Sequence, residues 1–103
     1  MASGTLGKAD LVAATATLLY TVPVGVTATI NVRFANRTAT GIAVRIAIGT
    51  GAAPALADYM SYDIGLPANG VVEDTGIVCS AGDKVWAVAA VAGVSVRVHG
   101  FEG

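Results

Sequence analysis

The chain has 103 residues and a net charge of −1, and 13% of its residues are charged against 54% that are hydrophobic. This length suits one domain with one core. The near-neutral charge excludes an electrostatic surface for nucleic acid, and one cysteine, Cys79, excludes a disulfide framework within the chain. Soluble domains carry about a quarter charged residues, so we expect other subunits to cover part of the surface. The alternative is a monomer with a weakly polar surface rich in Ala and Thr.

The stretch Leu11–Val32 carries no formal charge and is long enough to span a bilayer. It contains Pro23, Gly25 and Thr residues at alternate positions, which fits strands better than a membrane helix. The same stretch has the form of a leader peptide, but Asp10 at its edge argues against cleavage. We therefore expect a protein that is made in the cytoplasm, is not cleaved, and contacts no membrane.

The first predicted element is a short arm, Met1–Lys8, which is rich in small residues and is expected to order only against a neighbour. The β domain is expected over residues 9–103. A first edge strand is predicted near Lys8–Ala14 and a second strand at Thr15–Val22, followed by a turn at Pro23-Val24-Gly25.

Two long strands come next and dominate the chain. Hydrophobic residues occupy alternate positions over Val26–Phe34 and Ile42–Ile48, the period of strands with one buried face. We expect a hairpin around the loop Asn36–Gly41, which would place Arg33 opposite Arg45. Like charges in that relation destabilise a sheet, so an acidic partner or a neighbouring subunit is expected beside them. The alternative is a solvated face with the side chains spread apart.

The remaining strands are shorter and follow at regular spacing. They are predicted at Asp58–Leu66, Val71–Cys79, Lys84–Ala90 and Val94–Phe101. Pro67-Ala68-Asn69-Gly70 is a strong turn signal, and Gly76 is expected to mark a bulge. About eight strands without a convincing helix predict an all-β, single-domain antiparallel β-sandwich, jelly-roll or Ig-like, with a closed barrel as the alternative.

Few residues offer catalytic or metal-binding chemistry. His99 is the one histidine, and one histidine with a distant cysteine does not make a zinc site. Asp63 and Glu73 flank one turn and could approach each other as a carboxylate pair, but pairing with arginines is the favoured interpretation. Asn36-Arg37-Thr38 has the form of a glycosylation site, yet it lies in a predicted turn. We expect no enzymatic activity, no metal and no cofactor.

Several runs of residues together carry a resemblance to a known class of proteins. They are Leu19-Tyr20-Thr21-Val22-Pro23-Val24-Gly25, Ala28-Thr29-Ile30-Asn31-Val32, Ala35-Asn36-Arg37-Thr38, Tyr62-Asp63, Leu66-Pro67-Ala68-Asn69-Gly70, Ser80-Ala81-Gly82-Asp83-Lys84-Val85-Trp86 and Val94-Ser95-Val96-Arg97-Val98-His99-Gly100-Phe101-Glu102. This order of turns and strands resembles small β-sandwich proteins encoded among the structural genes of tailed bacteriophages. Such domains occur as head decoration proteins and as parts of tails and fibres, and related sandwiches often pack as trimers.

The resemblance implies a non-enzymatic structural protein of the virion. Our first expectation is a capsid decoration, or cement, protein that forms a homo-oligomer, with a trimer favoured, and contacts the major capsid protein or another virion protein. The alternative is a tail or fibre module that binds a host-surface glycan or receptor. Its stacking platform would be Tyr59, Tyr62, Trp86 and Phe101.

Residues from the arm, the central loop and the outward strand positions are the candidates for the interface. They are Ser3, Leu6, Lys8, Arg33, Asn36, Arg37, Thr38, Arg45 and Arg97.

Overall fold

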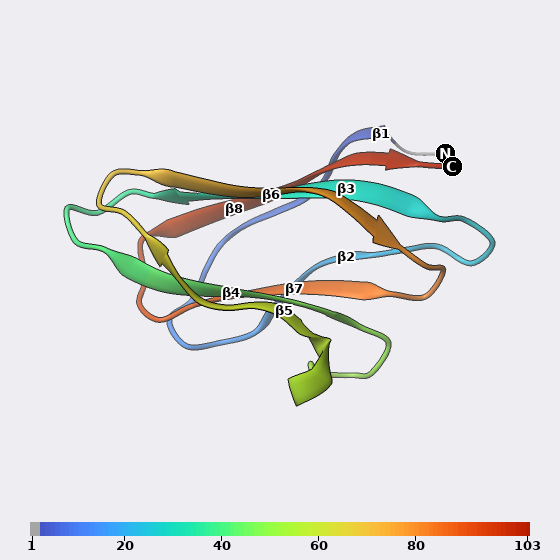
Figure 1. The fold of residues 1–103 in the computed structure, drawn as a ribbon, viewed down its shortest axis with the longest axis horizontal. Helices are drawn as coiled ribbons and strands as arrows, with labels where there is room; N and C mark the ends of the chain where they lie inside the picture. Colours follow the sequence, from blue (N-terminus) through green and yellow to red (C-terminus); the bar gives the residue numbers. More distant parts are fainter. Residues whose placement is uncertain (1–2) are drawn as a thin grey trace.

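The structure is a computed structural model that describes residues 3–103 as two antiparallel four-stranded sheets packed face to face (Figure 1). Sheet A has the spatial order β1 (Ser3–Asp10), β8 (Val94–Glu102), β3 (Ala28–Asn36), β6 (Val71–Cys79). Sheet B has the order β2 (Thr17–Thr21), β7 (Lys84–Ala89), β4 (Ile42–Gly49), β5 (Tyr59–Leu66). A short 3₁₀ turn, η1 (Leu56–Asp58), leads into β5. The predicted all-β sandwich of about eight strands is confirmed.

Strand pairing follows a single rule in which early strands pair with late ones. β1 pairs with β8, β2 with β7, β3 with β6, and β4 with β5, all antiparallel. This is the order obtained when one long antiparallel hairpin, with four strands in each arm, is rolled into two sheets. It is the arrangement of a jelly roll, which distinguishes the chain from the Ig-like alternative.

The predicted hairpin between β3 and β4 is wrong. β3 pairs with β8 and β6, whereas β4 pairs with β7 and β5, so the loop between β3 and β4 crosses from one sheet to the other. Both strands are central in their sheets, and each buries its hydrophobic face against the opposite sheet. Alternation shows which face of a strand is buried, but it does not show which strand lies beside it. Arg33 and Arg45 consequently lie on different sheets.

The N-terminal segment is an edge strand of sheet A. From Ser3 to Asp10 it pairs with β8, with a register shift between Thr5 and Gly7, and Leu6 packs against the core. The predicted arm over residues 1–8 is therefore replaced, from Ser3 onward, by a paired strand, because its backbone groups join the β8 ladder. Met1 and Ala2 lie outside the described residues.

The core is built from the inward-facing residues of both sheets. Fully buried positions include Ile30, Val32 and Phe34 of β3 and Val44 and Ile46 of β4. The alternation of β4 slips after Ile46, because Ala47 is buried as well, where the register with β5 shifts. The bulge predicted at Gly76 is confirmed, since the β3–β6 register shifts opposite it and its φ is +69°.

Both ends of the described chain lie at the same end of the sandwich (Figure 1). Ser3 is the cross-strand partner of Phe101, and Gly103 exchanges two backbone hydrogen bonds with Thr27, of 2.7 and 3.1 Å. The turns at 37–41, 67–70 and 90–93 lie at the opposite end (Figure 1).

Candidate functional site

A row of charged residues crosses the outer face of sheet A. Lys8 of β1 is the cross-strand partner of Arg97 of β8, Arg97 is the partner of Arg33 of β3, and Arg33 is the partner of Glu73 of β6. Their side chains point outward because their neighbours in sequence face the core, as Val32, Phe34, Val96 and Val98 do. Three cationic residues therefore occupy neighbouring positions on three adjacent strands.

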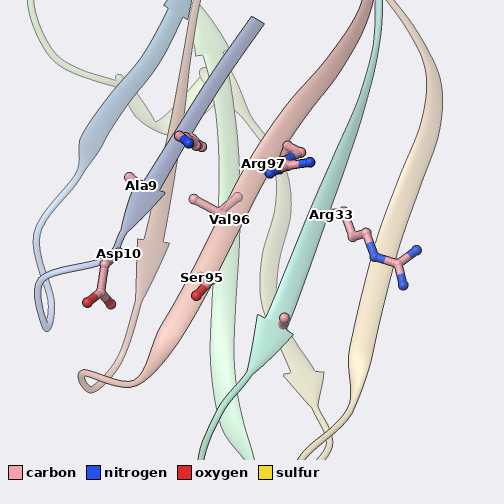
Figure 2. Close-up of a pocket in the computed structure, with 8 residues that line it drawn as sticks. Ala9, Asp10, Arg33, Ser95, Val96 and Arg97 are labelled. Atoms are coloured by element: carbon pink, nitrogen blue, oxygen red, sulfur yellow. The ribbon is translucent and has the colours of Figure 1, made fainter. Parts of the chain in front are cut away.

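The row borders an open hollow of about 600 Å³ (Figure 2). The next position along the strands carries Asp10, Ser95 and Ala35, and the short side chains of Ser95 and Ala35 leave space between the longer ones. Figure 2 shows the Arg33 side chain extending toward the neighbouring strand, away from Arg97. The hollow thus has small residues in its floor, cations along one side and the Asp10 carboxylate at its edge.

Some of the basic residues on this face have a carboxylate partner and others have none within the described residues. Glu73 lies 3.6 Å from Nη1 of Arg33 through one carboxylate oxygen, and its other oxygen lies 3.2 Å from Nε2 of His99. Asp10 accepts a hydrogen bond from Arg37. Among residues 3–103, no carboxylate lies within ion-pair distance of Lys8 or Arg97.

His99 adds one unsatisfied polar atom to the same face. Its side chain is about one third exposed, and its Nδ1 is buried with no hydrogen-bond partner in the described part of the chain. The ring sits one outward position from Arg97 along β8 and pairs across the sheet with Asn31. Asn31 itself accepts a hydrogen bond of 3.0 Å from the backbone N–H of Gly76.

A separate polar group lies on the outer face of sheet B. Arg45 donates a 2.7 Å hydrogen bond from Nε to Asp63, and its guanidinium lies 3.7 Å from the centre of the Tyr62 ring. The hydrogen bond from Arg45 lowers the pKa of Asp63, and the same bond raises the pKa of Arg45. Tyr59 packs edge-on against Tyr62, with ring centres 5.3 Å apart. This group is locally satisfied and does not contact the row on sheet A.

Burial shifts the pKa of two further titratable groups. The Tyr20 hydroxyl donates to the Glu102 carboxylate, and burial together with that carboxylate raises the pKa of Tyr20 well above its usual range. Burial raises the pKa of Cys79 to about 11, with the negative charge of Asp83 contributing. A fully buried thiol with a raised pKa is a poor nucleophile at neutral pH, consistent with a packing role for Cys79.

The structure does not bring the predicted interface residues together on one surface. Lys8, Arg33 and Arg97 are brought together in the row, whereas Arg45 lies on the other sheet. Ser3 is exposed at the start of β1, Leu6 is half-buried against the core, and Arg37 is exposed and paired with Asp10. Asn36 is 4% exposed, and its Oδ1 accepts hydrogen bonds from the N–H and hydroxyl of the partly buried Thr38 in the turn that follows. Asn36 therefore cannot present its side chain to a partner.

The structure assembles neither the predicted aromatic platform nor the possible carboxylate pair. Trp86 is buried in sheet B, Phe101 lies on sheet A, and only Tyr59 and Tyr62 are in contact, so the four aromatic residues form no common platform. Asp63 and Glu73 lie on opposite sheets, each beside its own arginine.

One surface was missed by sequence reasoning. Phe101 and Val78 both flank Thr29 across sheet A, and they are 56% and 70% exposed. The loop between β2 and β3 lies at the same end of the sandwich (Figure 1), and Val24 in this loop is 95% exposed. We call Val24, Val78 and Phe101 the apolar end. The outward alternation of Val78 and Phe101 was a usable signal, but their adjacency required the order β8-β3-β6.

Residues 3–103 contain no group of three or more His, Cys, Asp or Glu side chains placed to hold a metal ion. Within the same range, no helix has the length and apolar character needed to cross a membrane.

Comparisons of the chain with protein-family models, with curated proteins and with solved structures find no match. The function is accordingly inferred from the surfaces described above and from the resemblance carried by the sequence.

Proposed function

We propose that the protein is a non-enzymatic structural component of a tailed-bacteriophage particle, acting as a decoration protein on the outside of the capsid. The observation that carries the proposal is the apolar end, where three large hydrophobic side chains are more than half exposed. Exposed apolar groups that gather on a small protein mark contact surfaces. A low charge content over the whole chain supports the same interpretation.

The jelly-roll frame suits this role. Its inner faces are fully used by the core, so binding must occur on outer faces, ends and loops. A protein that binds the assembled lattice more tightly than a loosened one stabilises the lattice by mass action. Burial of one Val or Phe side chain contributes about 1.5–3 kcal/mol, so three such side chains supply a useful part of a lattice contact.

Binding to capsids tests the proposal directly. Purified protein is mixed with expanded capsids of the encoding phage that lack it, and sedimentation measures the bound fraction. We expect saturable binding that is weakened in the double variant Val78→Ser/Phe101→Ser. The control is Val71→Ser/Val91→Ser, which removes two comparably exposed side chains at the opposite end of the sandwich. Absence of binding by the unmodified protein would overturn the proposal.

Self-association is a second part of the same proposal, with a trimer as the favoured state. Light scattering at several concentrations measures the mass of the 10.2 kDa chain in solution. A mass three times that of the chain supports the trimer. A monomer at every concentration would contradict the homo-oligomer. The capsid would then be the partner proposed to cover the apolar end.

A further inference from the structure

We propose that the hollow beside Lys8, Arg97 and Arg33 is a carboxylate-binding site for an acidic segment of another protein. This inference concerns a different part of sheet A from the apolar end and does not require the decoration role.

The first argument is the unfavourable pairing of like charges. Lys8 and Arg97 are direct cross-strand partners, and Arg33 is the next partner in the same row. The Cβ atoms of directly opposed residues are about 5 Å apart, and like charges in that relation destabilise the sheet. Arg33 has Glu73 as a counterion at 3.6 Å, but Lys8 and Arg97 have no carboxylate in ion-pair range within residues 3–103. An anion between them would convert this repulsion into attraction.

The second argument is that every acidic side chain of this chain already has a partner within its own fold. Each of its seven acidic side chains already has a partner. The pairs are Asp10 with Arg37, Asp58 with the Ala55 N–H, Asp63 with Arg45, Glu73 with Arg33 and His99, Asp74 with the Ser61 hydroxyl, Asp83 with the Ser80 N–H, and Glu102 with the Tyr20 hydroxyl. A second copy of the chain could offer only carboxylates that are already engaged in its own fold, which favours a different protein as the source.

The third argument is the shape and extent of the positive charge. The hollow of about 600 Å³ is floored by Ser95 and Ala35, so a side-chain carboxylate can approach the Arg97 guanidinium. Asp10 at the next position and Glu73 at the end of the row bound the positive region. It is too short to follow a polyanionic chain such as nucleic acid, but it matches one or two carboxylates of an extended segment.

A binding measurement tests the site with a defined probe. Fluorescence anisotropy follows a labelled Glu-Gly-Glu-Gly-Glu peptide, whose carboxylates lie on one face when it is extended, and the matched peptide with Gln in place of Glu. The titration uses the full chain at low ionic strength, where charges are least screened. We expect the acidic peptide alone to bind, and Lys8→Gln/Arg97→Gln to lower its affinity at least about tenfold.

The control variant is Arg45→Gln/Lys84→Gln, which changes the net charge by the same amount on residues away from the hollow. It is expected to keep the affinity of the unmodified protein. Equal weakening by both variants, or no binding of the acidic peptide, overturns the site. Tighter binding of a sulfated oligosaccharide through Lys8 and Arg97 would overturn the assignment to a protein segment.

Thermal unfolding provides a readout that does not depend on the probe. Removal of the Lys8–Arg97 repulsion should leave the double variant at least as stable as the unmodified protein at low salt, and added salt should stabilise the unmodified protein more. A variant less stable than the unmodified protein would mean that the two cations already stabilise the fold and would contradict the proposal.

Discussion

The side chain of Asn36 on β3 binds the backbone of Leu66 on β5, although the two strands belong to different sheets. Its Nδ2 donates to the carbonyls of Thr40, Leu66 and Pro67 at 2.8, 3.3 and 3.1 Å, and its Oδ1 accepts from the N–H and hydroxyl of Thr38. One amide thus joins the crossing loop between β3 and β4 to the turn between β5 and β6.

Replacement of Asn36 by Ala should therefore destabilise the protein strongly. The change removes the Asn36 donor from the buried Leu66 carbonyl and the Asn36 acceptor from the N–H and hydroxyl of Thr38, and we expect a loss of about 2–4 kcal/mol in the free energy of unfolding. Urea denaturation measures this loss. The matched control is Asn31→Ala, which removes an amide with one hydrogen bond and should cost about 1 kcal/mol. Equal losses for the two variants would contradict the bridging role of Asn36.

Tyr20→Phe should lower stability and change its dependence on alkaline pH. The folded protein holds the pKa of Tyr20 above its unfolded value through burial and Glu102. That contribution is complete below about pH 10 and is lost as pH rises through the folded pKa. At pH 7 we expect the free energy of unfolding of the variant to be about 1 kcal/mol lower than that of the unmodified protein. Above pH 10 the free energy of unfolding should fall less in the variant than in the unmodified protein. Parallel pH–stability curves would show that Tyr20 is not the group responsible.

The Cys79 thiol should react slowly while the protein is folded. Its side chain is fully buried and its pKa is raised to about 11, so little thiolate exists at pH 8. A chromogenic disulfide reagent should label it quickly in urea and slowly without urea, at a rate that follows opening of the fold. Because the folded pKa lies above the unfolded one, stability should fall as the pH rises toward 11. Rapid labelling of the folded protein would contradict the burial of Cys79.

Gly7→Ala should disrupt the contact between β1 and β2. A Cβ on Gly7 would lie 2.1 Å from the carbonyl oxygen of Leu19, and backbone cannot move away as a flexible side chain can. We expect a loss of about 3 kcal/mol, the upper part of the range for overpacking. Gly65→Ala is the control, because its Cβ would have no atom within 4 Å. A thermal unfolding midpoint for Gly7→Ala that matches that of Gly65→Ala would argue against the close approach.

The sequence predicted the strands well because burial of one face produces a visible period of two. The expected ranges for the last four strands agree with β5, β6, β7 and β8 to within one residue at each end. The sequence did not predict the partners of β3 and β4. A short polar loop after Asn36 suggested a hairpin, whereas the Asn36 side chain shapes that loop into a crossing between sheets.

The candidate site was only partly predictable for the same reason. The alternation of β3 and β8 predicts that Arg33 and Arg97 face outward. Lys8, however, falls in the predicted arm, and the predicted hairpin puts Arg45 opposite Arg33, although the two lie on different sheets. Their grouping depends on β8 lying between β1 and β3, a long-range pairing that no local pattern encodes. That no carboxylate within residues 3–103 pairs with Lys8 or Arg97 likewise follows only from the positions of all seven acidic side chains.

The neighbouring ends of the chain have a practical consequence for any assay of this protein. Because Ser3 pairs with Phe101, a purification tag or fluorophore joined to either terminus emerges beside the apolar end. Insertion after Ala92, in the exposed turn at the far end of the sandwich, keeps that surface clear. Two fusions of the same tag should thus behave oppositely, with terminal fusions obstructing the proposed lattice contact and the internal fusion permitting it.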